Sequence, residues 1–164
     1  MVLVLMGVAG AGKTTVGRLL AEELGWDFKD ADDYHSAANV EKMRSGIPLD
    51  DADRAPWLEA LRVLILDWIA AGRNGVLACS ALKRSYRDRL QVAPEVHFVY
   101  LKVTTAQLQQ RLHARHGHYM SEQMLASQLA ALEEPENAIT IDADGAPEKI
   151  VSEIRARFAP TKIA

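Results

Sequence analysis

The chain of 164 residues has a single cysteine, no long hydrophobic run and no excess of charge of one sign. Because Cys79 has no second cysteine to pair with, an internal disulfide is excluded, which fits a reducing compartment. No apolar stretch approaches the roughly 20 residues that a membrane-spanning helix needs. No charged leader or cleavage signal precedes the first apolar run. We therefore expect a cytoplasmic protein without a membrane partner.

The charges are balanced, with 19 Lys and Arg against 22 Asp and Glu and a net charge of −3. Non-specific nucleic-acid binding needs a concentrated cationic face, and no basic run provides one, so nucleic acid is not an expected partner. No internal repeat, low-complexity segment or linker divides the chain. Its length suits one domain, residues 1–164, with a sizeable core.

Short apolar runs alternate with amphipathic stretches, a pattern typical of a parallel α/β sheet. Strands are expected at residues 2–6, 26–29, 76–79, 96–103 and 138–141. Helices are expected at residues 14–24, 37–43, 104–112, 121–132 and 147–158. A longer helix is expected to begin after a cap at Asp53 and to end near Gly72. The predicted fold is a three-layer α/β/α domain with a five-stranded parallel sheet, whose ligands bind at the carboxyl ends of the strands.

Residues 7–14 read Gly-Val-Ala-Gly-Ala-Gly-Lys-Thr and match the phosphate-binding loop pattern G-x-x-x-x-G-K-[ST] between an expected strand and an expected helix. The glycines let the backbone approach a ligand, and the N–H groups that open the helix can bind anionic oxygens. Lys13 adds a positive charge for the β- and γ-phosphates, and the Thr14 hydroxyl is placed to ligate Mg²⁺. The pattern predicts binding of a nucleoside triphosphate. The residues expected to hold it are Gly7, Val8, Ala9, Gly10, Ala11, Gly12, Lys13, Thr14 and Thr15.

An acidic cluster, Asp30 to Asp33, follows the second expected strand. One carboxylate there can orient the hydroxyl of a phosphoryl acceptor and take its proton, while a neighbouring one holds Mg²⁺ through water. Asp30 and Asp32 are two residues apart, so an extended backbone would point both the same way. We favour a functional role for Asp32, whereas Asp33 is expected only to cap a helix. His35 either contacts the substrate or only completes the turn.

A basic stretch that contains glycine, residues 111–120, interrupts the regular pattern. Arg111 and Arg115 lie four residues apart and can neutralise charge on a transferred phosphoryl group, which predicts a lid over about residues 113–121. Such a lid would exclude water and prevent wasteful hydrolysis. A solvated basic helix is the alternative. The histidines of this stretch lack the matching Cys or His pair of a zinc site.

Further cations surround the third expected strand and the long helix: Arg54, Lys83, Arg84 and Arg87. Charges on helix surfaces usually serve solubility alone. Their position past a strand end allows them instead to clamp the carboxylate of an anionic substrate. Within the apolar strand, Cys79 is expected to be a small buried residue rather than a nucleophile.

Several segments together resemble one family. They are residues 7–14, Asp-Ala-Asp-Asp-Tyr-His at 30–35, Gly-Ile-Pro-Leu-Asp-Asp at 46–51, Asp-Arg-Ala-Pro-Trp-Leu at 53–58, Cys-Ser-Ala-Leu-Lys at 79–83 and Gly-His-Tyr-Met at 117–120. With these segments the chain resembles the small P-loop gluconokinases from its first strand to its last helix. Pro-Trp-Leu and Cys-Ser-Ala-Leu-Lys are the most specific of them.

The resemblance implies ATP-dependent phosphorylation of D-gluconate at its 6-hydroxyl. It also implies a P-loop NTPase fold of the nucleoside-monophosphate-kinase type with a lid, and often a homodimer. It makes Lys13, Asp32, Arg111 and Arg115 the catalytic candidates and places Asp30 with Thr14 at the metal, although Asp30 could instead be the base. The expected gluconate contacts are Asp32, His35, Arg54, Lys83, Arg87 and His118.

The chain departs from the family pattern at few positions. Ala9 and Ala11 replace the serines usual in this loop, which removes hydroxyls but leaves the backbone N–H groups. No Walker-B aspartate follows residues 76–79, so metal ligation beyond Thr14 stays open.

Two other classes of function also stay open, a kinase for another small molecule and a regulator. A shikimate kinase or a nucleoside-monophosphate kinase would share the fold, but Cys79-Ser80-Ala81 stands where shikimate kinases have a glycine triplet. A nucleotide-binding regulator would bind ATP without phosphorylating a small molecule, which would leave the expected base, lid and cations without a task.

Overall fold

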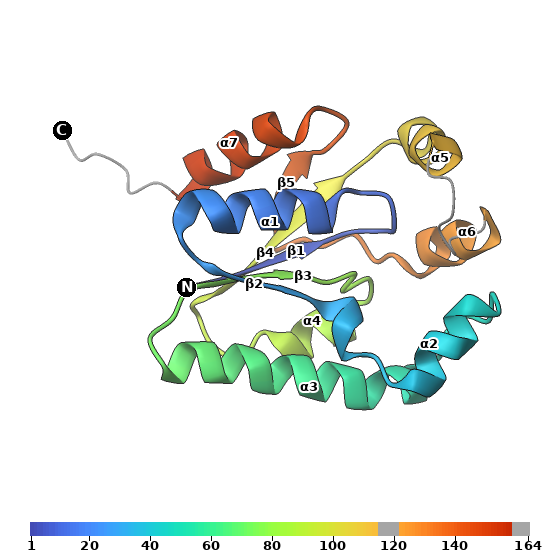
Figure 1. The fold of residues 1–164 in the computed structure, drawn as a ribbon, viewed down its shortest axis with the longest axis horizontal. Coiled ribbons are helices and arrows are strands. Elements are labelled where there is room, and N and C mark those ends of the chain that lie inside the picture. The colour runs from blue at the N-terminus through green and yellow to red at the C-terminus, as the bar shows by residue number, and fades with distance from the viewer. Residues whose placement is uncertain (115–121, 159–164) are drawn as a thin grey trace.

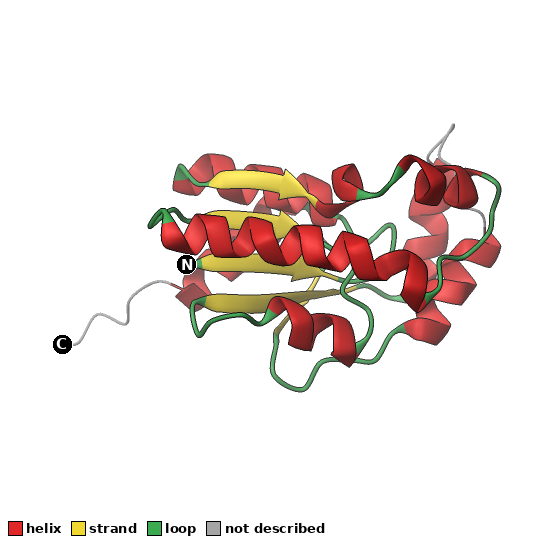
Figure 2. Ribbon diagram, turned by 90° about the horizontal axis from the view of Figure 1, so that it is seen from below, coloured by secondary structure: helices red, strands yellow, loops and turns green. Residues whose placement is uncertain are grey.

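The computed structural model describes residues 1–114 and 122–158, without the side chains of residues 112–114, 122 and 123. Its strands are β1 (Val2–Met6), β2 (Asp27–Asp30), β3 (Gly75–Ala78), β4 (Val96–Lys102) and β5 (Ile139–Asp142). They form one sheet in the order β2-β3-β1-β4-β5, and every neighbouring pair is parallel. The strand arrows accordingly point to the same side of the molecule in Figure 2. The predicted five-stranded parallel sheet is confirmed.

Helices cover both faces of this sheet (Figure 1). One face carries α1 (Lys13–Leu24) and α7 (Pro147–Phe158), and the other carries α3 (Asp51–Ala70) and α4 (Arg84–Leu90). The remaining helices are the 3-10 helix η1 (Ala31–Tyr34), α2 (Ala37–Arg44), α5 (Thr105–Ala114) and α6 (Glu122–Ala131). The predicted three-layer architecture is therefore confirmed. In the described residues, no helix is both long and apolar enough to cross a membrane.

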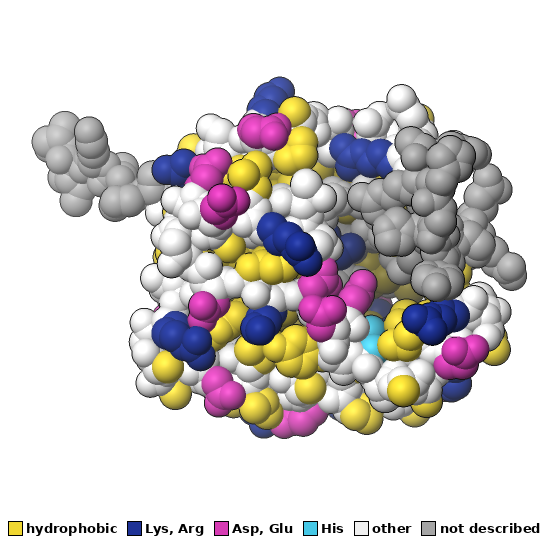
Figure 3. Space-filling view, viewed as in Figure 1, with side chains coloured by type: hydrophobic (Ala, Val, Ile, Leu, Met, Phe, Trp, Pro, Cys, Tyr) yellow, Lys and Arg dark blue, Asp and Glu magenta, His cyan; other side chains and the backbone are white. Residues whose placement is uncertain are grey.

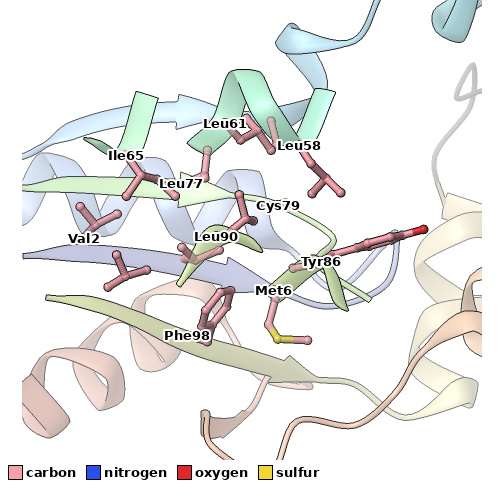
Figure 4. Close-up of a cluster of buried hydrophobic side chains, with 14 of the residues drawn as sticks. Val2, Met6, Leu58, Leu61, Ile65, Leu77, Cys79, Tyr86, Leu90 and Phe98 are labelled. Carbon is pink, nitrogen blue, oxygen red and sulfur yellow. The ribbon is translucent and has the colours of Figure 1, made fainter. Parts of the chain in front are cut away.

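The central strand β1 is apolar throughout because helices cover both of its faces. Val2, Val4 and Met6 pack in the cluster with α3 and α4, whereas Leu3 and Leu5 pack in the cluster with α1 and α7. Successive side chains of a strand point to opposite faces, so a strand covered twice has no polar face. Figure 4 shows the first of these two clusters.

Cys79 belongs to this first cluster and is buried, as predicted. Burial raises the pKa of its thiol to about 12. The thiol therefore stays protonated at neutral pH and contributes as a small apolar group.

Trp57 and Trp68, both on α3, are also core residues. Trp68 lies directly over the backbone of Gly75, where a Cβ atom would stand 2.5 Å from Cε3 of the indole. Glycine at the start of β3 is thus a packing requirement rather than a turn feature.

The start of α3 differs from the prediction. Asp50, and not Asp53, caps the helix: its side chain accepts a hydrogen bond from the N–H of Asp53 at 2.7 Å. The Asp53 side chain in turn accepts from the N–H of Asp50 at 3.1 Å, which completes a reciprocal capping box. The helix therefore begins at Asp51, and Pro56 lies inside it.

We predict that Gly75→Ala lowers the free energy of unfolding by about 1–3 kcal/mol, because the added methyl group must displace the Trp68 ring or the strand. Urea denaturation followed by fluorescence measures this loss. Gly145→Ala is the matched control, since its Cβ would meet only Lys149 Cδ, at 3.7 Å. Wild-type stability of Gly75→Ala would contradict the described packing.

Candidate active site

The phosphate loop, residues 7–14, joins β1 to α1 at the carboxyl edge of the sheet. Gly7, Gly10 and Gly12 have φ angles of 142°, 83° and 93°, which L side chains rarely adopt. A Cβ atom at Gly7 would also stand 2.9 Å from the carbonyl oxygen of Leu101. Gly12 immediately precedes α1 and has no side chain to cap it. The first N–H groups of α1 can therefore serve an anion, as the sequence pattern predicts.

The loop is tied to the end of β2 by one short hydrogen bond. Thr14 Oγ1 donates to Asp30 Oδ2 at 2.6 Å. A hydroxyl and a carboxylate are the oxygen ligands that Mg²⁺ takes in phosphoryl-transfer sites, where waters and substrate phosphates complete its shell. Among the described residues no group of three or more His, Cys, Asp or Glu side chains could hold a metal ion. The pair thus fits an ion bound together with phosphates.

The sequence predicts an extended backbone for the acidic turn that follows β2, but this turn is helical. Asp30 ends β2, and its Oδ1 accepts from the N–H of Asp32 at 3.1 Å, so Asp30 caps η1. Asp33, which is predicted to cap the following helix, lies inside η1 and is exposed. Ser36 caps α2 instead, since its Oγ accepts from the N–H of Asn39 at 3.2 Å. Trp57 binds the backbone of this turn, since its Nε1 donates to the Ala31 carbonyl at 2.7 Å. The tryptophan is therefore both a core residue and a support of the acidic turn.

Asp32 has a raised pKa. The residue is exposed at the surface, yet the neighbouring protein atoms desolvate its carboxyl group, and this desolvation is the main cause of the raised pKa. The Asp30 carboxylate adds to it, while the positive charge of Lys13 acts in the opposite direction. A carboxylate with a raised pKa is a better proton acceptor than an ordinary aspartate.

His35 is a neutral side chain in this site. Its ring stacks on Trp57, with centroids 4.6 Å apart and planes 9° from parallel. Burial, followed by the charge of Arg54, lowers its pKa to about 4. Its Nδ1 is a buried atom with no hydrogen-bond partner in the part of the chain that the structure describes. His35 is also the C-cap residue of η1. Its imidazole Nδ1 remains available for a further hydrogen bond.

Arg54 and Lys83 are linked through two residues for which the sequence predicts no role, Asp51 and Tyr86. Lys83 Nζ lies 2.7 Å from Asp51 Oδ1, and the Tyr86 hydroxyl donates to the same oxygen. Arg54 NH1 donates to the Tyr86 hydroxyl oxygen at 3.3 Å. The ring of Tyr86 belongs to the core, while its hydroxyl points out of the cluster toward the side where the strands end (Figure 4).

Arg87 does not join this cluster. It is buried, and its NH1 donates to the carbonyl oxygens of Ala81 and Leu82, both at 3.0 Å. Ala81 has a φ of 42°, so this loop needs support against strain. Arg87 therefore supports the loop after β3 through NH1, and its expected contact with the substrate stays a prediction.

Arg111 contacts the phosphate loop and the loop that follows β5. Its NH1 donates to the Gly10 carbonyl at 3.1 Å and its NH2 to the Ala143 carbonyl at 2.6 Å. It borders a cavity of about 360 Å³ beside residues 10–12, together with Gln107, Asp144 and Pro147. The sequence pattern gave no indication of this cavity, because the loop after β5 reaches it only in the folded chain.

The other expected site residues, Arg115 and His118, and the lid over about residues 113–121 lie outside the described residues, apart from the backbone of residues 113 and 114. On the face shown in Figure 3, acidic and basic side chains gather beside a hollow on the side where the strands end.

The chain shares this architecture with known kinases. The family model for shikimate kinase matches residues 9–159. Gluconokinase of Gluconobacter oxydans is 46% identical over 160 residues, which cover 95% of this chain and 90% of that protein. The solved structure of a gluconokinase from Sinorhizobium meliloti is 40% identical, with a TM-score of 0.82 over 96% of this chain and 92% of that one. The chain belongs to the gluconokinase family.

The solved shikimate kinase structures are more distant in sequence, and their likeness to this gluconokinase-family chain shows the fold alone. The shikimate kinase structure from Bacteroides thetaiotaomicron has a TM-score of 0.67 but only 19% identity. The family relation thus confirms the predicted resemblance.

We predict that His35 makes stability depend on pH. The unfolded chain binds a proton at this residue below about pH 6.5, whereas the folded protein binds it only below about pH 4. Between these values the unfolded state holds more protons, so the free energy of unfolding falls as the pH is lowered through this window. His35→Asn should remove this part of the pH dependence in urea unfolding. An NMR titration midpoint of His35 near 6.5 would contradict the prediction.

Proposed function

We propose that this protein transfers the γ-phosphoryl group of ATP to the 6-hydroxyl of D-gluconate, giving 6-phospho-D-gluconate and ADP. The names of its relatives support this acceptor. The observation that carries the mechanism is the hydrogen bond from Thr14 to Asp30, because it joins the phosphate loop to the turn that bears Asp32.

The phosphates of ATP would bind to the backbone of residues 7–15 and to the ammonium group of Lys13. The adenine ring of ATP would occupy the cavity beside Arg111, Asp144 and Pro147. Thr14 and Asp30 would hold Mg²⁺, which would neutralise charge on the phosphates when bound.

Gluconate carries a carboxylate at one end and the reacting hydroxyl at the other. Arg54 and Lys83 supply positive charge for the carboxylate, in place of their present partners Tyr86 and Asp51. Asp32 would accept the proton of the 6-hydroxyl as its oxygen bonds to the γ-phosphorus and the bond to the leaving ADP breaks. The neutral ring of His35 suits a hydrogen bond to a hydroxyl of the acceptor.

Arg111 and Arg115 would neutralise the charge of the transferred group, with His118 contacting gluconate, if residues 113–121 form a lid. We further propose a homodimer, on the family resemblance, and a cytoplasmic location, on the features of the sequence described above. The expected partner is a small molecule, not nucleic acid or a membrane.

Product analysis tests the function directly. Incubation with ATP, Mg²⁺ and D-gluconate should give a product heavier by one phosphoryl group, placed on C6 by NMR. In a coupled assay of ADP release, D-gluconate should accelerate turnover, whereas shikimate and AMP should not. If no acceptor accelerates ADP release, the protein is a nucleotide-binding regulator and the proposal fails.

We predict that Asp32→Asn lowers kcat by about 10², because the amide cannot accept the proton, while ATP affinity stays within about twofold. Asp33→Asn, at the exposed neighbouring position, is the matched control and should keep wild-type turnover. An unchanged kcat in Asp32→Asn would transfer the role of base to Asp30 or to solvent.

Lys13→Ala should lower kcat by about 10² or more, since the alanine cannot follow the charge that develops on the γ-phosphate. Steady-state kinetics with saturating gluconate measures this loss. Lys29→Ala removes an equal charge from the exposed surface of β2 and should have no such effect.

A further inference from the structure

Helix α6 reaches the phosphate loop with a polar side chain that the sequence did not single out. Gln128 Oε1 accepts a hydrogen bond from the N–H of Ala9 at 2.7 Å, across 119 positions of sequence. The bond is partly shielded from solvent. It is a contact between the loop and the helix that follows the expected lid.

The Ala9 N–H belongs to the same peptide group as the carbonyl of Val8. That carbonyl accepts a hydrogen bond from Lys13 Nζ at 3.0 Å. Because a peptide group is planar and rigid, Lys13 and Gln128 hold opposite ends of one unit. A donor on the carbonyl and an acceptor on the N–H polarise it in the same sense, so each bond strengthens the other.

The packing of α6 makes the position of Gln128 specific. Leu125, three residues earlier, belongs to one buried cluster with Val8, Leu82 and Leu108. Just beyond α6, the N–H of Glu133 donates to the Leu82 carbonyl at 2.9 Å. The helix is therefore anchored both to the phosphate loop and to the loop after β3, and a side chain on such a support is held in place.

We propose that Gln128 is a positioning residue for phosphoryl transfer. It orients the Val8–Ala9 peptide and, through that peptide, the ammonium group of Lys13 at the place where the terminal phosphates of ATP bind. The link to transfer rests on the proposed function, whereas the link to nucleotide binding rests only on the phosphate loop.

The variant Gln128→Leu tests this role, since leucine keeps the apolar stem but cannot accept from Ala9. We expect the affinity for a nonhydrolysable ATP analogue, measured by calorimetry, to fall about tenfold. We expect kcat to fall as well, with an unchanged KM for D-gluconate. Gln110→Leu, the same change on the exposed surface of α5, is the matched control. If Gln128→Leu does not fold, Gln128→Met replaces it.

A double-mutant cycle separates positioning from mere support of the fold. In the Lys13→Ala background, Gln128→Leu should change analogue affinity by less than about twofold, because the group it positions is gone. An equal loss in both backgrounds, or no loss in either, would overturn the inference. The affinity measurements of this cycle need no acceptor. If the protein did not phosphorylate D-gluconate, the proposed function would fail, but the cycle would still test the role of Gln128.

Discussion

The rest of the structure depends on the burial of β1, which has strands on both edges and helices on both faces. A strand in this position has no freedom to shift, because its alternating side chains serve two cores at once. The glycine loop that leaves it is held equally firmly, with Gly7 against the backbone of β4. Preorganised N–H groups of this kind bind phosphate without paying for loop ordering at the moment of binding.

The neighbouring parallel strands bring the other functional groups to the same edge. β3 lies between β1 and β2, and its following loop carries Lys83, while β2 delivers the acidic turn. Thr14 and Asp30 then join two of these segments by a direct hydrogen bond. The site is thus assembled from loops whose relative positions are set by the sheet, as in other open α/β folds.

The cations Arg54 and Lys83 at this edge have hydrogen-bond partners within the protein. Asp51 accepts from both Lys83 and Tyr86, and the hydrogen bond from Lys83 is the main cause that lowers the pKa of its carboxyl. Such pairs keep long cationic side chains ordered near the place where an anionic acceptor would bind. Exchange of one carboxylate for another costs less desolvation than the burial of bare cations would.

Neighbouring residues alone specify the unit of strand, glycine loop and helix at residues 2–24, the parallel α/β class and the residue types of the phosphate loop. These features rest on local periodicity and on glycine geometry, which neighbouring residues encode. Other features follow only from the packing of the whole chain. Asp50 rather than Asp53 caps α3, Arg87 turns inward to the carbonyls of Ala81 and Leu82, and Gln128 reaches Ala9. Each of these outcomes depends on which groups the packed sheet brings within hydrogen-bond distance. The sequence around each residue does not indicate which distant group will be its partner.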